Sequence, residues 1–215
     1  MTLLIFDLDG TLIDSRLDLA NSVNAARAHL GLAPICNETV YSYVGNGAPA
    51  LIRRALGNDA PESEVQAALE FFLAYYREHM LDNTTLYPGV RNALDRLHAR
   101  KVPMAVLTNK PVRMSVAIVE GLGLTNHFER VYGGNSFEFK KPHRIGIDTL
   151  VADCGASKEE TIMVGDSAVD IQTARNAGVR ACGVTYGFQP ETFARTPPDF
   201  LVDRLEELAD QVTEK

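Results

Sequence analysis

The sequence predicts an α/β protein in which helices flank a parallel sheet and a separate helical block is inserted into the chain. Short, continuously apolar runs recur along it, and such runs are typical of strands buried on both faces. Amphipathic segments of helix length separate most of these runs, which is the pattern of βα units. One long stretch, residues 15–83, contains helix-like segments alone.

Expected strands and helices alternate in the sheet-forming part of the chain. We expect strands at 3–6, 103–107, 130–132, 161–164, 179–184 and 200–202. We expect helices at 90–100, 112–122, 145–154 and 168–177. Strands joined by crossover helices align in parallel, so their carboxyl ends share one edge of the sheet, where open sheets bind ligands.

The stretch that breaks the alternation reads as a helical cap. Its helix-like segments are 17–30, 38–43, 48–56 and 62–80. In the first of them, Leu19, Val23, Ala26 and Leu30 recur at three- and four-residue spacing, which places them on one helix face. We therefore expect two domains, a core formed by 1–14 with 84–215 and a cap formed by 15–83.

Composition narrows the classes of function. The 215 residues carry a formal net charge of -7, which argues against nucleic acid as a partner because nucleic acid attracts basic surfaces. No apolar run is long enough to span a bilayer, and no signal-peptide pattern opens the chain. The three scattered cysteines are typical of reduced thiols, so we expect a cytoplasmic protein. We further expect a monomer or a small homo-oligomer.

An acidic motif, Asp7-Leu8-Asp9-Gly10-Thr11, follows the first apolar run. Two carboxylates two residues apart can approach one site if the chain leaves the extended state, and Gly10 permits this. Their mutual repulsion is costly unless a cation neutralises part of the charge. A strand-ending aspartate followed by a turn is the alternative interpretation. The buried run ahead of the motif and its Gly-Thr ending favour a functional site.

A second acidic motif contains Asp166, Ser167 and Asp170 and stands between an expected strand and an expected helix. Asp166 is therefore expected at the same sheet edge as Asp7, with Asp170 one helical turn later. Carboxylates gathered at one point suit a small hard cation such as Mg²⁺. Capping of the helix by Asp166 or Ser167, with Asp170 in its first turn, is the alternative. Together with the first motif, the pattern favours a metal site.

Two further motifs supply groups that can bind phosphate. Thr108 and Asn109 end one strand with a hydroxyl and an amide, close to a helix N-terminus, although Thr108 could simply cap that helix. We interpret Lys110, the next residue, as a surface or entrance charge. Lys141 lies in a Lys-Lys-Pro run that in isolation is typical of a solvated surface. Facing the carboxylates, it would balance the charge of the nucleophile and the phosphate.

These four motifs, each after an apolar strand, resemble those of the haloacid-dehalogenase-like (HAD) phosphohydrolase superfamily over essentially the whole chain. The resemblance implies a Rossmann-like core. It implies that Asp7 is the nucleophile and forms an aspartyl-phosphate, and that Asp9 protonates the leaving alcohol and then activates water. Thr108 and Lys141 would hold the phosphate.

The same resemblance implies a Mg²⁺ site. Its ligands would be Asp7, the Asp9 backbone carbonyl and Asp166, with Asp170 supporting the metal through water or indirect contacts. A carboxylate nucleophile divides hydrolysis into two displacements, while Mg²⁺ and a lysine offset the charge on the phosphoryl oxygens.

Within the superfamily the chain is similar to phosphoglycolate phosphatases. The motifs that carry this are 7–15 with Asp18, Val44-Gly45-Asn46-Gly47 ahead of 51–56, and Phe139-Lys140-Lys141-Pro142-His143. We expect the Gly45 loop to contact the leaving group and Arg53 to meet a substrate carboxylate. The expected reaction is hydrolysis of 2-phosphoglycolate to glycolate and phosphate. Arg144 stands where this family usually has a second proline, which affects the expected geometry of the Lys141 loop.

Other functions remain open at this point. Pyrophosphate, nucleoside monophosphates and sugar phosphates are alternative substrates. A β-phosphoglucomutase-like phosphomutase would use the same Asp7 and Asp9, but Thr11 argues against it because such mutases tend to have valine there. A phosphorylated receiver domain combines similar residues without a helical block after its first strand. A non-catalytic phosphate-binding relative would lack one of the expected residue types, and all are present.

Overall fold

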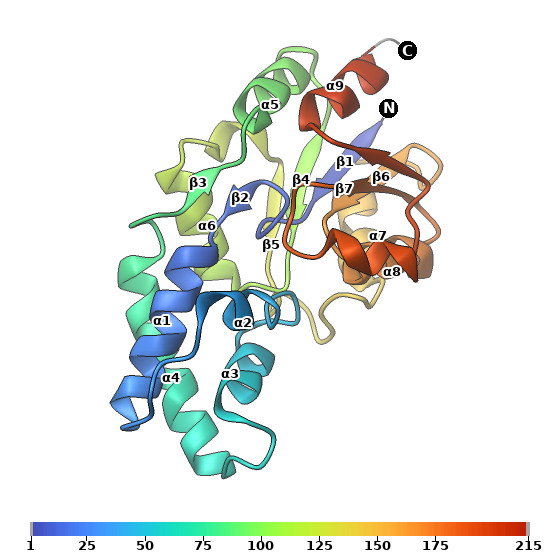
Figure 1. Cartoon of the computed structure of the whole chain (residues 1–215). Coiled ribbons are helices and arrows are strands. Elements are labelled where there is room, and N and C mark those ends of the chain that lie inside the picture. Colours follow the sequence, from blue (N-terminus) through green and yellow to red (C-terminus); the bar gives the residue numbers. More distant parts are fainter. Residues whose placement is uncertain (1, 214–215) are drawn as a thin grey trace. The chain divides into compact units, whose positions relative to one another are not determined.

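The computed structural model describes residues 2–213, and Figure 1 shows the course of the chain. The chain divides into two units. One comprises the residues up to Asp14 together with those from Leu86 onward, and the other is Ser15–Thr85. Each unit is described by itself below.

A six-stranded sheet with order β5-β4-β1-β6-β7-β8 forms the centre of the first unit. Its strands are β1 (Leu3–Phe6), β4 (Met104–Leu107), β5 (Arg130–Tyr132), β6 (Thr161–Gly165), β7 (Arg180–Val184) and β8 (Phe200–Val202). Every neighbouring pair is parallel. Because Phe6 is in register with both Val106 and Val164, the residues that follow β1, β4 and β6 emerge at the same edge of the sheet.

Helices cover both faces of this sheet (Figure 1). They are α5 (Val90–Ala99), α6 (Val112–Gly121), α7 (Ile145–Asp153), α8 (Ala168–Ala177) and α9 (Leu205–Thr213), with short 3₁₀ turns η1 (Thr125–His127) and η2 (Pro190–Ala194). Right-handed crossovers place α7 and α8 on one face and α5 and α6 on the other, where α9 packs on α5. Leu3, Ile5 and Met163 form a fully buried core with Ile147 and Leu150 of α7.

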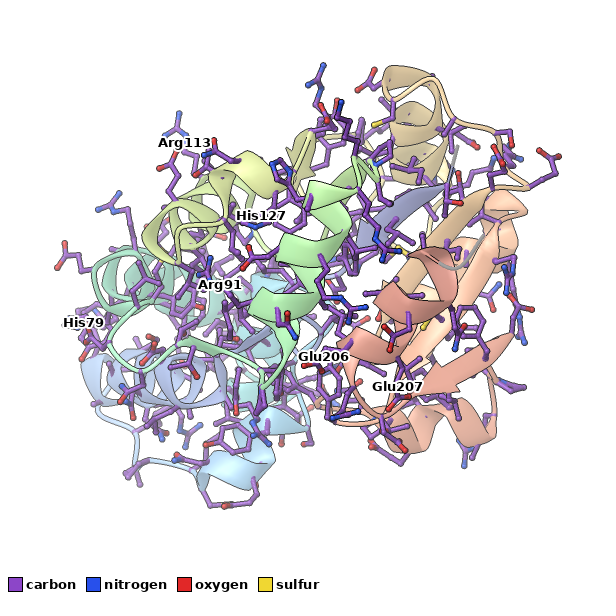
Figure 2. All side chains as sticks on the ribbon, turned by 90° about the horizontal axis from the view of Figure 1, so that it is seen from above. His79, Arg91, Arg113, His127, Glu206 and Glu207 are labelled. Atoms are coloured by element: carbon purple, nitrogen blue, oxygen red, sulfur yellow. The ribbon has the colours of Figure 1, made fainter. Side chains whose placement is uncertain are left out.

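Polar side chains connect α5 to its neighbours, and Figure 2 labels three of them, Arg91, His127 and Glu206. Arg91 Nη1 donates to the carbonyl of Gly123 at 3.2 Å, and His127 Nε2 lies 2.7 Å from Asp95 Oδ1. The carboxylate of Glu206 on α9 lies against the N-terminus of α5, where a negative charge is favourable. These contacts hold the N-terminal end of α5, which begins a few residues after the chain re-enters the first unit at Leu86.

The second unit consists of α1 (Arg16–His29), α2 (Asn37–Tyr41), α3 (Ala48–Leu56) and α4 (Glu62–His79), with α1 packed along α4. Its two ends are joined by the buried carboxylate of Asp18. This group accepts hydrogen bonds from the backbone N–H groups of Asn83 and Thr84 at 3.0 and 2.8 Å, and from the Thr84 hydroxyl at 2.8 Å. A buried carboxylate with this many donors compensates for the water it has lost.

The predicted fold class is confirmed, and the expected strands and helices all form, with ends that match or differ by at most two residues. The elements of the described residues that were not predicted are α9, the 3₁₀ turns η1 and η2, and the two-residue strands β2 (Ile13–Asp14) and β3 (Thr85–Leu86), which pair in a two-stranded sheet. Two-residue strands carry no periodicity, and only their pairing defines them. Among the described residues, no helix combines the length and the apolar character needed to cross a membrane.

Candidate active site

Three buried carboxylates meet at the carboxyl edge of the sheet. Asp7 follows β1, Asp166 follows β6, and Asp170 lies in the first turn of α8. Each offers a carboxylate oxygen that lies within 4.8 Å of the other two. The Asp7 N–H donates to the Val164 carbonyl at 2.9 Å, which continues the β1–β6 ladder by one residue. The parallel pairing of two central strands thus brings together residues that are far apart in the sequence.

Lys141 supplies a positive charge to this cluster. Its Nζ lies 2.9 Å from Asp7 Oδ1 and 2.7 Å from Asp170 Oδ1, and its side chain is only 2 % exposed. A solvated surface position, the alternative interpretation of the Lys-Lys-Pro run, is therefore wrong for Lys141. Burial lowers the pKa of Lys141, but Asp170 and Asp7 together outweigh it and raise the pKa above its ordinary value. The side chain is a permanent cation here.

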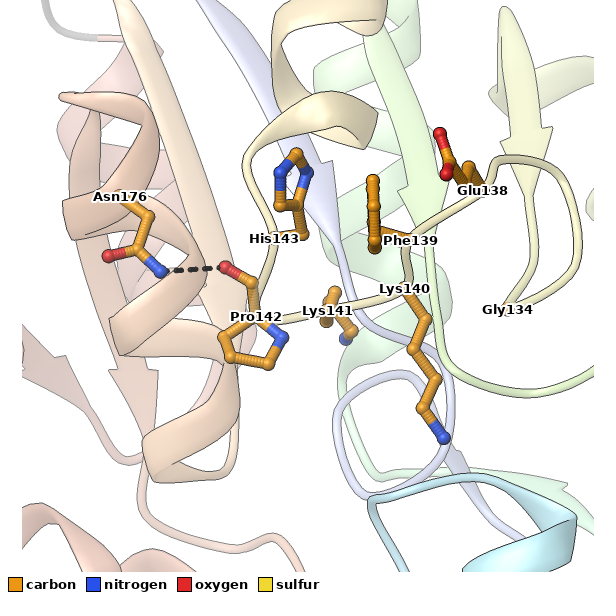
Figure 3. A pocket seen from close by; sticks show the side chains of 8 residues that line it. All are labelled: Gly134, Glu138, Phe139, Lys140, Lys141, Pro142, His143 and Asn176. Carbon is orange, nitrogen blue, oxygen red and sulfur yellow. Dashed lines mark hydrogen bonds between the residues drawn. The ribbon is translucent and has the colours of Figure 1, made fainter.

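The loop that carries Lys141 is anchored through its backbone. Asn109 Nδ2 donates to the Lys141 carbonyl at 3.2 Å, and Asn176 Nδ2 of α8 donates to the Pro142 carbonyl at 2.8 Å (Figure 3). Figure 3 also shows Lys140 and Lys141 pointing in different directions, and Lys140 is exposed. The loop passes into α7 at Arg144, whose guanidinium pairs with Asp148 one turn further along. Arg144 in place of a proline is thus compatible with the predicted helix start.

Asp170 both caps helix α8 and contacts Lys141, while its support of a metal stays a prediction. Its Oδ2 accepts hydrogen bonds from Ser167 N at 3.2 Å and Ser167 Oγ at 2.8 Å, which forms a capping box at the start of α8. Its Oδ1 accepts from Lys141. The cap fixes the rotamer of Asp170, and this in turn fixes where the lysine ammonium can lie.

Asp166 is held by loops that approach it closely. Its Oδ2 accepts the Phe188 N–H at 2.7 Å. Gly10 has a φ of 81° and lies so close to Asp166 that an added Cβ would stand 2.3 Å from Oδ2. Glycine is required at this position for both reasons. Gly187 approaches Asp166 from another loop, with an added Cβ 2.2 Å from the Asp166 Cβ.

The cluster carries more negative than positive charge, and the pKa values reflect this. Burial raises the pKa of Asp7 to about 6, although Lys141 acts against the shift and Asp170 adds to it. Burial, then the charges of Asp170 and Asp7, raise the pKa of Asp166 well above its usual range. The single ammonium of Lys141 leaves the three carboxylates with an excess of negative charge. Their oxygens are the ligands that a hard divalent cation prefers. The residues present therefore fit a Mg²⁺ ion.

Asp9 lies outside this carboxylate cluster and is paired with Lys110. Lys110 Nζ donates to Asp9 Oδ1 at 2.8 Å and Oδ2 at 2.9 Å, and the two side chains are 4 % and 14 % exposed. The interpretation of Lys110 as a surface or entrance charge is therefore wrong. A signal existed in the sequence: Asp9 and Lys110 are each the third residue after the neighbouring strands β1 and β4. The residue types around Lys110 do not reveal that it stands at the same distance from its strand as Asp9 does from β1.

Thr108 and Asn109 follow β4 at the same edge and are both buried. Thr108 Oγ1 accepts the Lys110 N–H at 3.3 Å, and Thr108 does not cap α6, whose N-cap is Pro111. Capping, the alternative interpretation of Thr108, is therefore wrong. The amide donor of Asn109 is used to hold the Lys141 backbone.

The remaining predicted residues, Gly45 and Arg53, belong to the second unit. Gly45 has a φ of 112°, a conformation that favours glycine. Arg53 Nη1 donates to the Ala60 carbonyl at 2.8 Å, and its guanidinium also pairs with Glu62. Arg53 is thus bound within its own unit, and its contact with a substrate stays a prediction.

The chain is similar to known proteins along most of its length. The profile of the haloacid dehalogenase-like hydrolase family matches residues 4–184. Two relatives, both called phosphoglycolate phosphatase, come from Chromobacterium violaceum and Agrobacterium fabrum. The first is 42% identical over 95% of this chain and 93% of its own, and the second 38% identical over 99% and 93%.

A solved structure is also similar along its whole length. It is a crystal structure of a predicted phosphoglycolate phosphatase from Haemophilus somnus, with a TM-score of 0.93, 32% sequence identity, and 99% of this chain and 98% of that chain covered. The matched family region runs from β1 to β7 and so includes the acidic cluster, Lys141 and the Asp9–Lys110 pair. The chain belongs to the haloacid dehalogenase-like hydrolase family.

Proposed function

We propose that this protein is a Mg²⁺-dependent phosphatase that hydrolyses 2-phosphoglycolate to glycolate and phosphate through an aspartyl-phosphate on Asp7. One observation carries the proposal: the buried Asp7 carboxylate lies against Lys141 in a cluster whose charge calls for a divalent cation. The names of the relatives that cover nearly the whole chain support the choice of substrate. We further expect a cytoplasmic location, on the basis of the cysteine content.

In the first displacement, an oxygen of Asp7 attacks phosphorus while the bond from phosphorus to the glycolate oxygen breaks. Asp9 gives a proton to that oxygen, so glycolate leaves as an alcohol. In the second displacement, a water molecule loses a proton to Asp9 and attacks phosphorus, which releases Asp7 and inorganic phosphate. Atoms and charges balance over the two steps, and Asp9 returns to its initial protonation state.

The surrounding residues stabilise the charge that develops on the phosphoryl oxygens. Lys141 provides a fixed ammonium, and Thr108 provides a hydroxyl at the end of β4. Asp7, Asp166 and the Asp9 backbone carbonyl would be the ligands of the Mg²⁺. Asp170 would support the metal through water or indirect contacts. A bound Mg²⁺ would neutralise charge on the phosphoryl group and on the nucleophile. Asn109 acts indirectly, because it holds the Lys141 backbone.

The test is phosphate release by the purified protein from a panel of 2-phosphoglycolate, pyrophosphate, nucleoside monophosphates and sugar phosphates, with Mg²⁺ or with EDTA. We expect turnover with 2-phosphoglycolate that requires Mg²⁺ and is lost in Asp7→Asn. Isomerisation of a sugar phosphate without release of phosphate would contradict hydrolysis. Normal turnover in Asp7→Asn would contradict the assigned nucleophile. A thermal unfolding curve of the variant, compared with wild type, separates loss of chemistry from loss of fold.

A further inference from the structure

The Asp9–Lys110 pair places a second ammonium group, that of Lys110, beside the site. It is distinct from the ammonium of Lys141, which contacts the nucleophile Asp7. The ammonium of Lys110 is within hydrogen-bond distance of both oxygens of Asp9, at 2.8 and 2.9 Å. The ammonium of Lys141 contacts Asp7 and Asp170 instead. The two lysines therefore divide the site: Lys141 serves the attacked phosphoryl group, and Lys110 serves the side on which Asp9 works.

That side is where the leaving group must lie. If Asp9 transfers a proton to the oxygen that departs from phosphorus, this oxygen stands within hydrogen-bond distance of the Asp9 carboxylate. Lys110 contacts the same carboxylate, so its ammonium lies within a few ångströms of the leaving group. In 2-phosphoglycolate, a single methylene carbon separates the departing oxygen from a carboxylate. That carboxylate consequently comes within reach of Lys110.

We propose that Lys110 is a specificity-determining residue that binds the carboxylate of the leaving group and so selects phosphate esters of α-hydroxy acids over esters of neutral alcohols. This inference rests on the proposed phosphatase function and deepens it. A substrate carboxylate competes with Asp9 for the Lys110 ammonium and takes over part of its hydrogen bonding. A neutral alcohol offers no anion and leaves Lys110 on Asp9.

Other cations are less suited to this task. Lys141 is buried between Asp7 and Asp170, and moving it to the leaving group would strip the nucleophile of its counter-charge. Arg53, the residue that sequence reasoning selected for a substrate carboxylate, is bound to Ala60 and Glu62 within the second unit. Lys110 is placed by β4, in the same unit as the nucleophile, and its position relative to Asp9 is set by adjacent strands.

The decisive experiment compares two substrates that differ at one group, 2-phosphoglycolate and 2-hydroxyethyl phosphate, in which CH₂OH replaces the carboxylate. The measured quantity is the ratio of their kcat/KM values with saturating Mg²⁺. Wild type is expected to prefer 2-phosphoglycolate, and Lys110→Met is expected to reduce this preference roughly 10- to 150-fold, the range for a hydrogen bond to a charged group. Loss of Asp9 positioning would slow both substrates alike and leave the ratio unchanged.

Two further variants isolate the charge of Lys110. Lys110→Gln keeps a donor for Asp9 but removes the charge, and it is expected to lose the preference as Lys110→Met does. Lys101→Met is the matched control, because Lys101 is exposed and precedes β4 at the opposite edge of the sheet. The control should keep the wild-type ratio. If Lys110→Met unfolds, Lys110→Gln decides the question.

Binding without chemistry gives an independent measurement. In an Asp7→Asn background, calorimetry should show weaker binding of 2-phosphoglycolate after Lys110→Gln, with no comparable change for 2-hydroxyethyl phosphate. A wild-type ratio near one, or a ratio that Lys110 variants leave within twofold of wild type, would overturn the inference while phosphatase activity stands. If wild type releases phosphate from neither ester nor any other member of the panel, the proposed function itself fails.

Discussion

Replacement of Lys141 by methionine removes the ammonium that contacts both Asp7 and Asp170. The side chain of Lys141 is 2 % exposed and that of Asp170 is 0 % exposed, so water cannot replace the lost partner. Removing one member of a buried ion pair typically costs about 3–5 kcal/mol of unfolding free energy. That is a large part of the ~5–15 kcal/mol that holds an average domain together.

The assay is urea unfolding of Lys141→Met and wild type in EDTA, at pH 8 and at about pH 5. We expect the full cost at pH 8, where the cluster is most negatively charged. The cost should be smaller at the lower pH, because the pKa of Asp7 is already about 6 in the wild type and rises further without the lysine. Protonation then replaces the lysine as the means of neutralising the cluster.

Lys158→Met is the matched control for this experiment. Lys158 also pairs with an aspartate, Asp148, but the side chains are 33% and 31% exposed. A pair that water reaches in this way contributes about 0–1 kcal/mol, and the control should fall in that range. The reasoning is refuted if Lys141→Met costs less than about 1 kcal/mol at pH 8, since a buried pair would then behave like a surface pair. A cost independent of pH would refute the part of the argument that concerns Asp7.

Two more predictions concern the acidic cluster and the second unit. Because burial raises the pKa of Asp7 to about 6 in the folded protein, its contribution to stability is fully present below about pH 4 and is lost as pH rises through about 6; the pKa of Asp166 is raised as well, so its contribution changes in the same direction. Thermal unfolding in EDTA should show this loss of stability. Addition of Mg²⁺ should raise the melting temperature more at pH 8 than at pH 5, because protons compete with the metal for the carboxylates. An equal rise at both pH values would contradict the metal site. Asp18→Ala should cost roughly 2–4 kcal/mol in urea unfolding, because the Thr84 N–H and hydroxyl lose a buried acceptor. The exposed Asp59→Ala should change stability by less than about 0.5 kcal/mol, and equal costs for both would contradict the role of Asp18.

Much of the fold and part of the site followed from local patterns. The run 3–6 is apolar throughout because β1 lies between β4 and β6 and is buried on both faces. Asp7 and Asp166 could be assigned to one edge from the sequence, because each directly follows a buried strand of the same parallel sheet. Asp170 could be placed near them because it follows Asp166 by four residues, the spacing of one helical turn.

Tertiary structure decided which charges meet. Lys110 and Lys141 both stood in motifs rich in polar residues, and the equal offset of Asp9 and Lys110 from the ends of their strands divides the lysines between Asp9 and Asp7 only once the strand order is known. That division depends on strand order and on how far each loop carries its side chain past the end of the sheet. The contact of Asp18 with Thr84 likewise joins residues 66 positions apart.

The sequence by itself therefore determined the α/β class and the run of strands and helices, because periodicity and burial act over a few residues, while the role of Asp7 as nucleophile candidate came from the family resemblance of its motif. The three-dimensional arrangement decided the partners of each charge, because Coulomb energies depend on distances that only the packed chain defines. Asp7 was visible at the end of its strand from the start. The contacts of its lysine, and the second lysine beside Asp9, were defined only by the fold.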